Sequence, residues 1–134
     1  MRSMGMAAAL VIGVGGCGGS SSSTGTGPTT PTTTTPAPPP GGPTVTITAS
    51  GVSPKLLEIT VGSRVTFTNM DNVPHEMASD PHPTHEICPP INEVSALTPG
   101  QSRQTGVFTT ARTCGYHDHG QDSNTSLQGT IVIR

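Results

Sequence analysis

The chain has 134 residues, enough for one domain with extensions, and its net charge of −2 gives no strong field for steering a charged partner. Only 31% of the residues are hydrophobic and 2% are aromatic, and no long runs of helix-forming residues or basic patches occur. This composition excludes a helical bundle and makes nucleic acid an unsuitable partner. The feature that stands out is the presence of five His and three Cys in so short a chain.

Residues 1–17 are typical of a bacterial lipoprotein export signal. A cationic start at Arg2 precedes a short apolar run, and the small residues before Cys17 resemble a lipobox. The apolar run is too short to cross a bilayer as a helix. We expect lipidation of Cys17 to anchor the protein in the cell envelope, on the outer-membrane or periplasmic side. The alternative is an ordinary cleaved signal, after which the protein is exported without an anchor.

Residues 18–43 form a predicted linker between the signal and the rest of the chain. The segment consists of Gly and Ser, then Thr and Pro, with almost no apolar side chain. Such a composition cannot bury enough surface to offset the entropy lost on ordering. We therefore expect a disordered tether that holds the following domain away from a membrane.

Residues 44–134 form the predicted domain, in which apolar residues recur with a period of two. Short alternating segments rich in β-branched residues, separated by turn residues, are typical of an all-β sandwich or barrel. Strands are predicted at 44–48, 55–61, 64–69 and 129–133, with weaker candidates at 101–108 and in the segment that ends near Cys114.

The stretch 71–100 interrupts this pattern. It contains six Pro residues and no sustained alternation, yet it holds three of the five His and Cys88. A loop of this length inside a compact domain is usually functional or disordered. The clustering of His and Cys favours function.

Two motifs in the domain have the residue types of a copper site. Asn69, Asp71 and His75 form an Asn-x-Asp-x-x-x-His stretch after a predicted strand, and Cys114 and His117 form a Cys-x-x-His stretch near the last strand. In both motif and strand context the domain resembles the cupredoxins, small Greek-key β-sandwich copper proteins. The resemblance implies a copper cofactor, the ligands His75, Cys114 and His117, and single-electron transfer with a redox partner protein rather than enzymatic catalysis.

Several features leave the ligand set open. The axial position of the family corresponds to Leu127, which has no donor atom, and His119 lies at a second spacing that the family uses. Cys88 and Cys114 are an even pair in an oxidising compartment, so a disulfide between them is an alternative to a thiolate ligand.

With that disulfide, the site would contain only His ligands. His75, His117 and His119 would then hold copper, with His82 or His85 as additional ligands. Such a protein would bind or deliver copper without rapid redox cycling. A small copper or zinc redox enzyme is a third alternative, because His-x-His on a β-sandwich suits either metal.

Overall fold

The structure is a computed structural model that describes residues 41–134. The predicted signal, including Cys17, and all of the predicted tether except its last three residues lie outside the described residues. Within the described part of the chain, no helix combines the length and apolar character required to span a bilayer.

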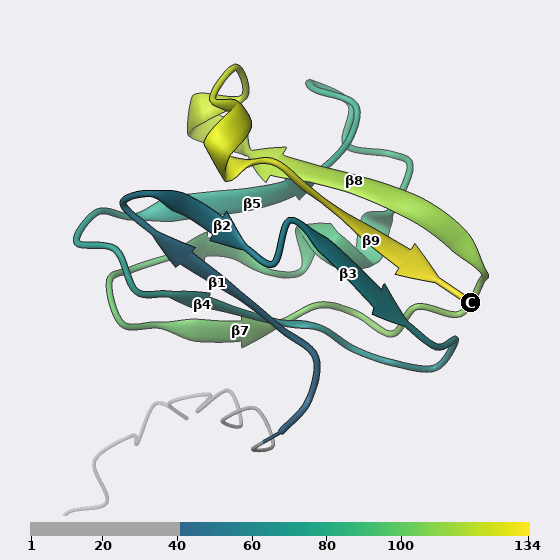
Figure 1. The fold of residues 1–134 in the computed structure, drawn as a ribbon. Coiled ribbons are helices and arrows are strands. Elements are labelled where there is room, and N and C mark those ends of the chain that lie inside the picture. Colours follow the sequence, from purple (N-terminus) through teal and green to yellow (C-terminus); the bar gives the residue numbers. More distant parts are fainter. Residues whose placement is uncertain (1–40) are drawn as a thin grey trace, which may run out of the picture. The chain divides into compact units, whose positions relative to one another are not determined.

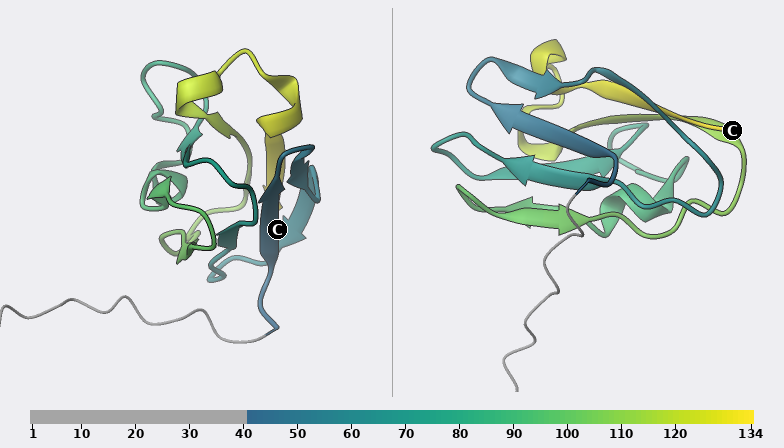
Figure 2. Two further views of the ribbon diagram at one scale, coloured as in Figure 1. Left: turned by 90° about the vertical axis from the view of Figure 1, so that its left-hand side faces the viewer. Right: turned by 60° about the horizontal axis from the view of Figure 1, so that its bottom comes forward.

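In residues 41–134, nine strands form two mixed sheets that face each other as a sandwich (Figures 1 and 2). One sheet has the strand order β2-β1-β4-β7, and the other has the order β3-β9-β8-β5-β6. The prediction of an all-β sandwich is thereby confirmed. The elements are β1 (Thr44–Thr48), β2 (Gly51–Ser53), β3 (Leu56–Ile59), β4 (Thr66–Asn69), β5 (His75–Ser79), α1 (Pro89–Asn92), β6 (Ser95–Leu97), β7 (Ser102–Gln104), β8 (Arg112–Asp118), η1 (His119–Gln121), η2 (Thr125–Leu127) and β9 (Gly129–Ile133).

The hydrophobic core lies between the two sheets and is built by the alternation seen in the sequence. Val45 and Ile47 on β1 and Ile131 and Ile133 on β9 are all buried. Phe67 on β4 meets Tyr116 on β8 edge to face, with ring centroids 5.1 Å apart. Burial of these apolar side chains supplies the main favourable term for folding.

The structure differs from the sequence prediction over residues 71–100. That stretch contains β5, the short helix α1 and β6 rather than one irregular loop. Four of the five side chains of β5 are buried, so the strand lacks a polar face and shows no alternation. The segment is a strand because it pairs with β6 on one side and β8 on the other.

Strand β8 carries two of the predicted site residues, Cys114 and His117, and its side chains alternate between two faces. Cys114, Tyr116 and Asp118 are buried on the side of the opposite sheet. Gly115 and His117 therefore face the outer side of the five-stranded sheet. The antiparallel register with β5 pairs Ala78 with His117.

Candidate metal centre

Four His side chains gather on the outer face of the five-stranded sheet. His117 comes from β8 and His119 from the start of η1, while His82 and His85 come from the loop that follows β5. One ring nitrogen from each of the four lies within 4.8 Å of the others. We call these four residues the histidine cluster.

His117 is the most strongly positioned member of the cluster. Its Nδ1 lies 2.7 Å from Asp80 Oδ1, so a ring protonated at Nδ1 donates to the carboxylate. Its Nε2 is buried and has no hydrogen-bond partner among the described residues. A carboxylate on one imidazole nitrogen and a free lone pair on the other is the arrangement of a supported metal ligand.

Gly115 makes room for this pair. Asp80 follows β5 and its backbone N–H donates to the Gly115 carbonyl over 3.0 Å, which continues the ladder between β5 and β8. A Cβ at Gly115 would collide with the Asp80 carboxylate. Absence of a side chain at this position therefore lets Asp80 reach His117.

His85 and His119 approach each other closely, with 3.2 Å between His85 Nε2 and His119 Nδ1. Partial burial, followed by the nearby rings of His119, His117 and His82, lowers the pKa of His85, while Glu76 opposes this shift. Because a metal ligand must be a neutral imidazole, a lowered pKa keeps the His85 lone pair available to lower pH.

The loop that supplies His82 and His85 is held by hydrogen bonds. The Asn92 side chain donates to the His85 carbonyl over 2.8 Å, and the Arg112 guanidinium donates to the Ile87 carbonyl over 2.7 Å. The His82 side chain is exposed, and its ring centroid lies 5.1 Å from that of His119 and 5.7 Å from that of His117. His82 thus completes the cluster at its solvent side.

The cluster has the donors for one borderline metal ion, and its closest pair also has the spacing. Two imidazole nitrogens on one tetrahedral ion, at bonds of about 2.0–2.1 Å, are separated by roughly 3.4 Å. The 3.2 Å between His85 and His119 matches this value. Imidazole donors suit copper and zinc, and among divalent first-row ions copper has the highest affinity for such donors.

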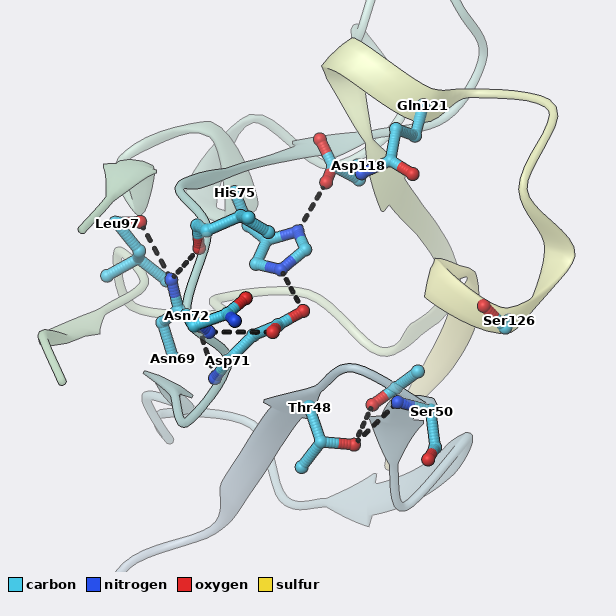
Figure 3. Close-up of polar contacts among 12 residues, drawn as sticks. Thr48, Ser50, Asn69, Asp71, Asn72, His75, Leu97, Asp118, Gln121 and Ser126 are labelled. Carbon is cyan, nitrogen blue, oxygen red and sulfur yellow. Dashed lines mark hydrogen bonds and ion pairs between the residues drawn. The ribbon is translucent and has the colours of Figure 1, made fainter. Parts of the chain in front are cut away.

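His75 does not join the cluster. It lies at the start of β5 with its side chain on the inner side, where it is 3% exposed. Its Nδ1 is 2.6 Å from Asp118 Oδ2, and its Nε2 is 3.2 Å from Asp71 Oδ2 (Figure 3). A carboxylate faces each ring nitrogen, and His75 is outside the group of described side chains that could share one metal ion, so the structure does not bring it together with the other predicted ligands.

Cys114 does not provide a thiolate either. It forms a disulfide with Cys88, across a Cα–Cα distance of 5.8 Å, and both residues are buried in the core. Of the two alternatives that the sequence left open, the structure therefore has the disulfide, and the thiolate-ligand prediction is wrong for this arrangement. Leu127 is buried in the hydrophobic core at the end of η2.

The predicted site residues thus divide into two groups. His117, His119, His82 and His85 come together, whereas His75 and Cys114 lie on the inner side of the sheet. Sequence reasoning missed Asp80. Its position two residues before His82 was a usable signal, since ligating imidazoles commonly need an orienting carboxylate.

Replacing Asp80 by Asn tests whether the carboxylate supports His117 as a ligand. Asp80→Asn keeps the shape but removes the charge that orients the Nδ1–H and raises ligand basicity. We expect the affinity for Cu(II) to fall roughly 10- to 100-fold. Isothermal titration with a competing chelator measures the change. Gly115→Ala, which displaces the same carboxylate, should reproduce it, whereas unchanged affinity in both variants contradicts the role of Asp80.

Comparison with known proteins finds similarity in structure alone. No protein-family model and no curated protein sequence matches the chain. A purple cupredoxin from Nitrosopumilus maritimus aligns over 69% of this chain and 99% of its own, with a TM-score of 0.53 and 22% identity.

Two other similar structures extend the comparison. A reduced amicyanin variant aligns over 70% of this chain and 83% of its own, with a TM-score of 0.53 and 23% identity. Plastocyanin from Dryopteris crassirhizoma aligns over 68% of this chain and 99% of its own, with a TM-score of 0.53 and 18% identity. The described part of the chain therefore has the cupredoxin fold.

Proposed function

We propose that this domain binds copper through the histidine cluster and holds or delivers the ion in the cell envelope. The observation that carries the proposal is His117, whose Nε2 is buried and unpartnered among the described residues while Nδ1 faces Asp80. Leaving a buried ring nitrogen without a partner costs free energy unless a ligand binds it. One of the similar structures is a Cu(I) form of an amicyanin variant, which makes copper the metal to test first.

In this proposal His117, His85, His119 and His82 hold the ion, and Asp80 orients His117. Copper bound there supplies a Lewis-acidic centre that can also exchange one electron. The chain itself keeps the ligand rings close together, and the exposed side chains of His82 and His119 leave one side of the cluster open to solvent. An open side suits transfer of the ion to another protein.

Electron transfer is the second candidate, and the fold favours it. A similar fern plastocyanin variant has been solved in oxidised and reduced forms. A similar amicyanin variant has been solved in its Cu(I) form. A site with four His ligands and no thiolate would lack the ligand that the resemblance implies for rapid cycling. Voltammetry decides between the candidates, because a carrier gives a reversible one-electron couple and a delivery protein does not.

The cellular setting remains part of the proposal. A lipidated Cys17 and the tether would place the domain at a membrane surface of the envelope, where a copper donor, a copper acceptor or a redox protein would be its partner. Labelling the expressed protein with radioactive palmitate, with Cys17→Ser as the control, tests the anchor. Label that persists in the control contradicts it.

The experiment that tests the copper proposal is a titration of the chain carrying Cys17→Ser with Cu(II). We expect one equivalent to bind with weak visible absorption and an electron paramagnetic resonance spectrum of nitrogen ligation. No free thiol should react before reduction, because the two remaining cysteines form a disulfide. An intense blue thiolate band, or no retention of copper after dialysis, contradicts the proposal.

A further inference from the structure

An Asp–His–Asp triad lies on the inner side of the sheet whose outer face carries the histidine cluster. Asp71, His75 and Asp118 form it, and the side chains of His75 and Asp118 are only 2% and 3% exposed (Figure 3). A buried imidazole flanked by two carboxylates requires an explanation, because burying charged groups costs free energy unless they are paired. The proposed copper ligands do not include this His.

Each ring nitrogen of His75 has its own carboxylate. Nδ1 lies 2.6 Å from Asp118 Oδ2, and Nε2 lies 3.2 Å from Asp71 Oδ2. The ring thus has a carboxylate within hydrogen-bond distance on both sides. The ring therefore acts as a rigid link between the turn after β4 and the end of β8.

The Asp71 end of this link is fixed by a buried Asn. Asn69 Nδ2 donates to the carbonyls of Val73 and Leu97 over 2.8 and 3.0 Å. Asn69 Oδ1 accepts from the backbone N–H of Asp71 over 2.8 Å. The Asn-x-Asp-x-x-x-His motif thus builds a closed turn that presents Asp71 to His75.

The Asp118 end of the link reaches the histidine cluster through the backbone. Asp118 lies between His117 and His119, and its Oδ1 accepts from the Gly120 N–H over 3.0 Å and from the Glu76 N–H over 3.4 Å. The carboxylate is thereby the N-cap of η1, the element in which His119 is the first residue. Through this cap the carboxylate holds the turn in which His119 lies.

We propose that His75 is a positioning residue of the histidine cluster, acting through Asp118 on the backbone that carries His119. The inference rests on the proposed function, and it assigns a different role to the residue that the family resemblance gives as a copper ligand. Hydrogen bonds from an outer residue fix the orientation of a metal ligand, and their loss weakens metal binding even though no ligand is removed. His75 and the metal would lie on opposite faces of the five-stranded sheet.

The test uses His75→Phe and His75→Gln in the full chain with Cys17→Ser. The Phe ring fills the space without donors, whereas the Gln amide keeps a donor for one carboxylate. We expect His75→Phe to lower Cu(II) affinity about tenfold and to shift the copper hyperfine splitting, with Gln partly restoring both. A merely structural role would reduce the folded fraction but leave the spectrum of the folded fraction unchanged, and that result overturns the inference.

A double-mutant cycle with His119→Ala separates positioning from ligation. If His75 acts through His119, adding His75→Phe to His119→Ala causes little further loss of affinity. If His75 is itself a ligand, the two losses add, and the inference is overturned. Asp118→Asn serves as a second route to the same link, should His75→Phe fold poorly, and it should give the same non-additivity.

A metal-free measurement keeps this inference distinct from the proposed function. Amide hydrogen exchange of Gly120, whose N–H donates to Asp118, should accelerate in His75→Phe relative to the parent chain. A parent chain that binds no copper overturns the proposed function, and the exchange rate then still decides whether His75 positions this turn. Unchanged Gly120 exchange overturns the inference.

Discussion

His117→Asn is expected to lower the affinity for Cu(II) by roughly 100-fold or more, since a direct ligand should matter at least as much as its supporting partner. The Asn side chain is a matched replacement, because its amide N–H lies near the position of Nδ1 and can donate to Asp80. It lacks an atom at the position of Nε2, the buried nitrogen without a partner. Chelator competition measures the affinity, and pulsed paramagnetic resonance counts the remaining imidazoles.

Two controls make this result specific to the ligand atom. His82→Ala removes an exposed ring at the solvent side of the cluster, and we expect a smaller loss of affinity, about tenfold. Circular dichroism and the absence of free thiols show whether His117→Asn has folded with its disulfide. Retention of copper by folded His117→Asn, with the affinity and spectrum of the parent chain, contradicts the placement of the site.

The fold was predictable because its strands carry local signals. The alternation in 44–48, 64–69 and 129–133 corresponds to β1, β4 and β9. Strand β5 was not predictable, since its side chains are buried on both faces and only its partners reveal it. The prediction of one irregular stretch over 71–100 failed for this reason.

The site was predictable in its residue types but not in its arrangement. His117 and His119 stand at alternate positions along the chain, and both contribute to the histidine cluster. Which residue lies behind them depends on where β8 ends, and the sequence has no local signal for this end. The strand continues four residues past Cys114, so Cys114 points into the core and Asp118 reaches His75.

Removing the disulfide with Cys88→Ser and Cys114→Ser together is expected to have the largest effect on stability. The bond closes a loop with a sequence separation of 26 residues, for which the chain-entropy model gives about 3.5 kcal/mol. A domain of this size should lose on the order of 15 °C or more in Tm. Thermal unfolding of the metal-free chain carrying Cys17→Ser, followed by circular dichroism, measures this loss.

The same variant should also weaken copper binding, because the disulfide anchors the end of the loop that carries His82 and His85. Cys88 donates its backbone N–H to Ser79 Oγ over 2.8 Å, so the loop is held to β5 and β8 at this point by a hydrogen bond and a covalent bond. Without the covalent bond, copper must order the loop as it binds, and this cost lowers the observed affinity. Saturating copper should therefore raise the Tm of the variant, because the ion binds only the ordered loop. A variant that unfolds at the parent temperature, or binds copper as tightly as the parent, contradicts the role of the disulfide as the anchor of the ligand loop.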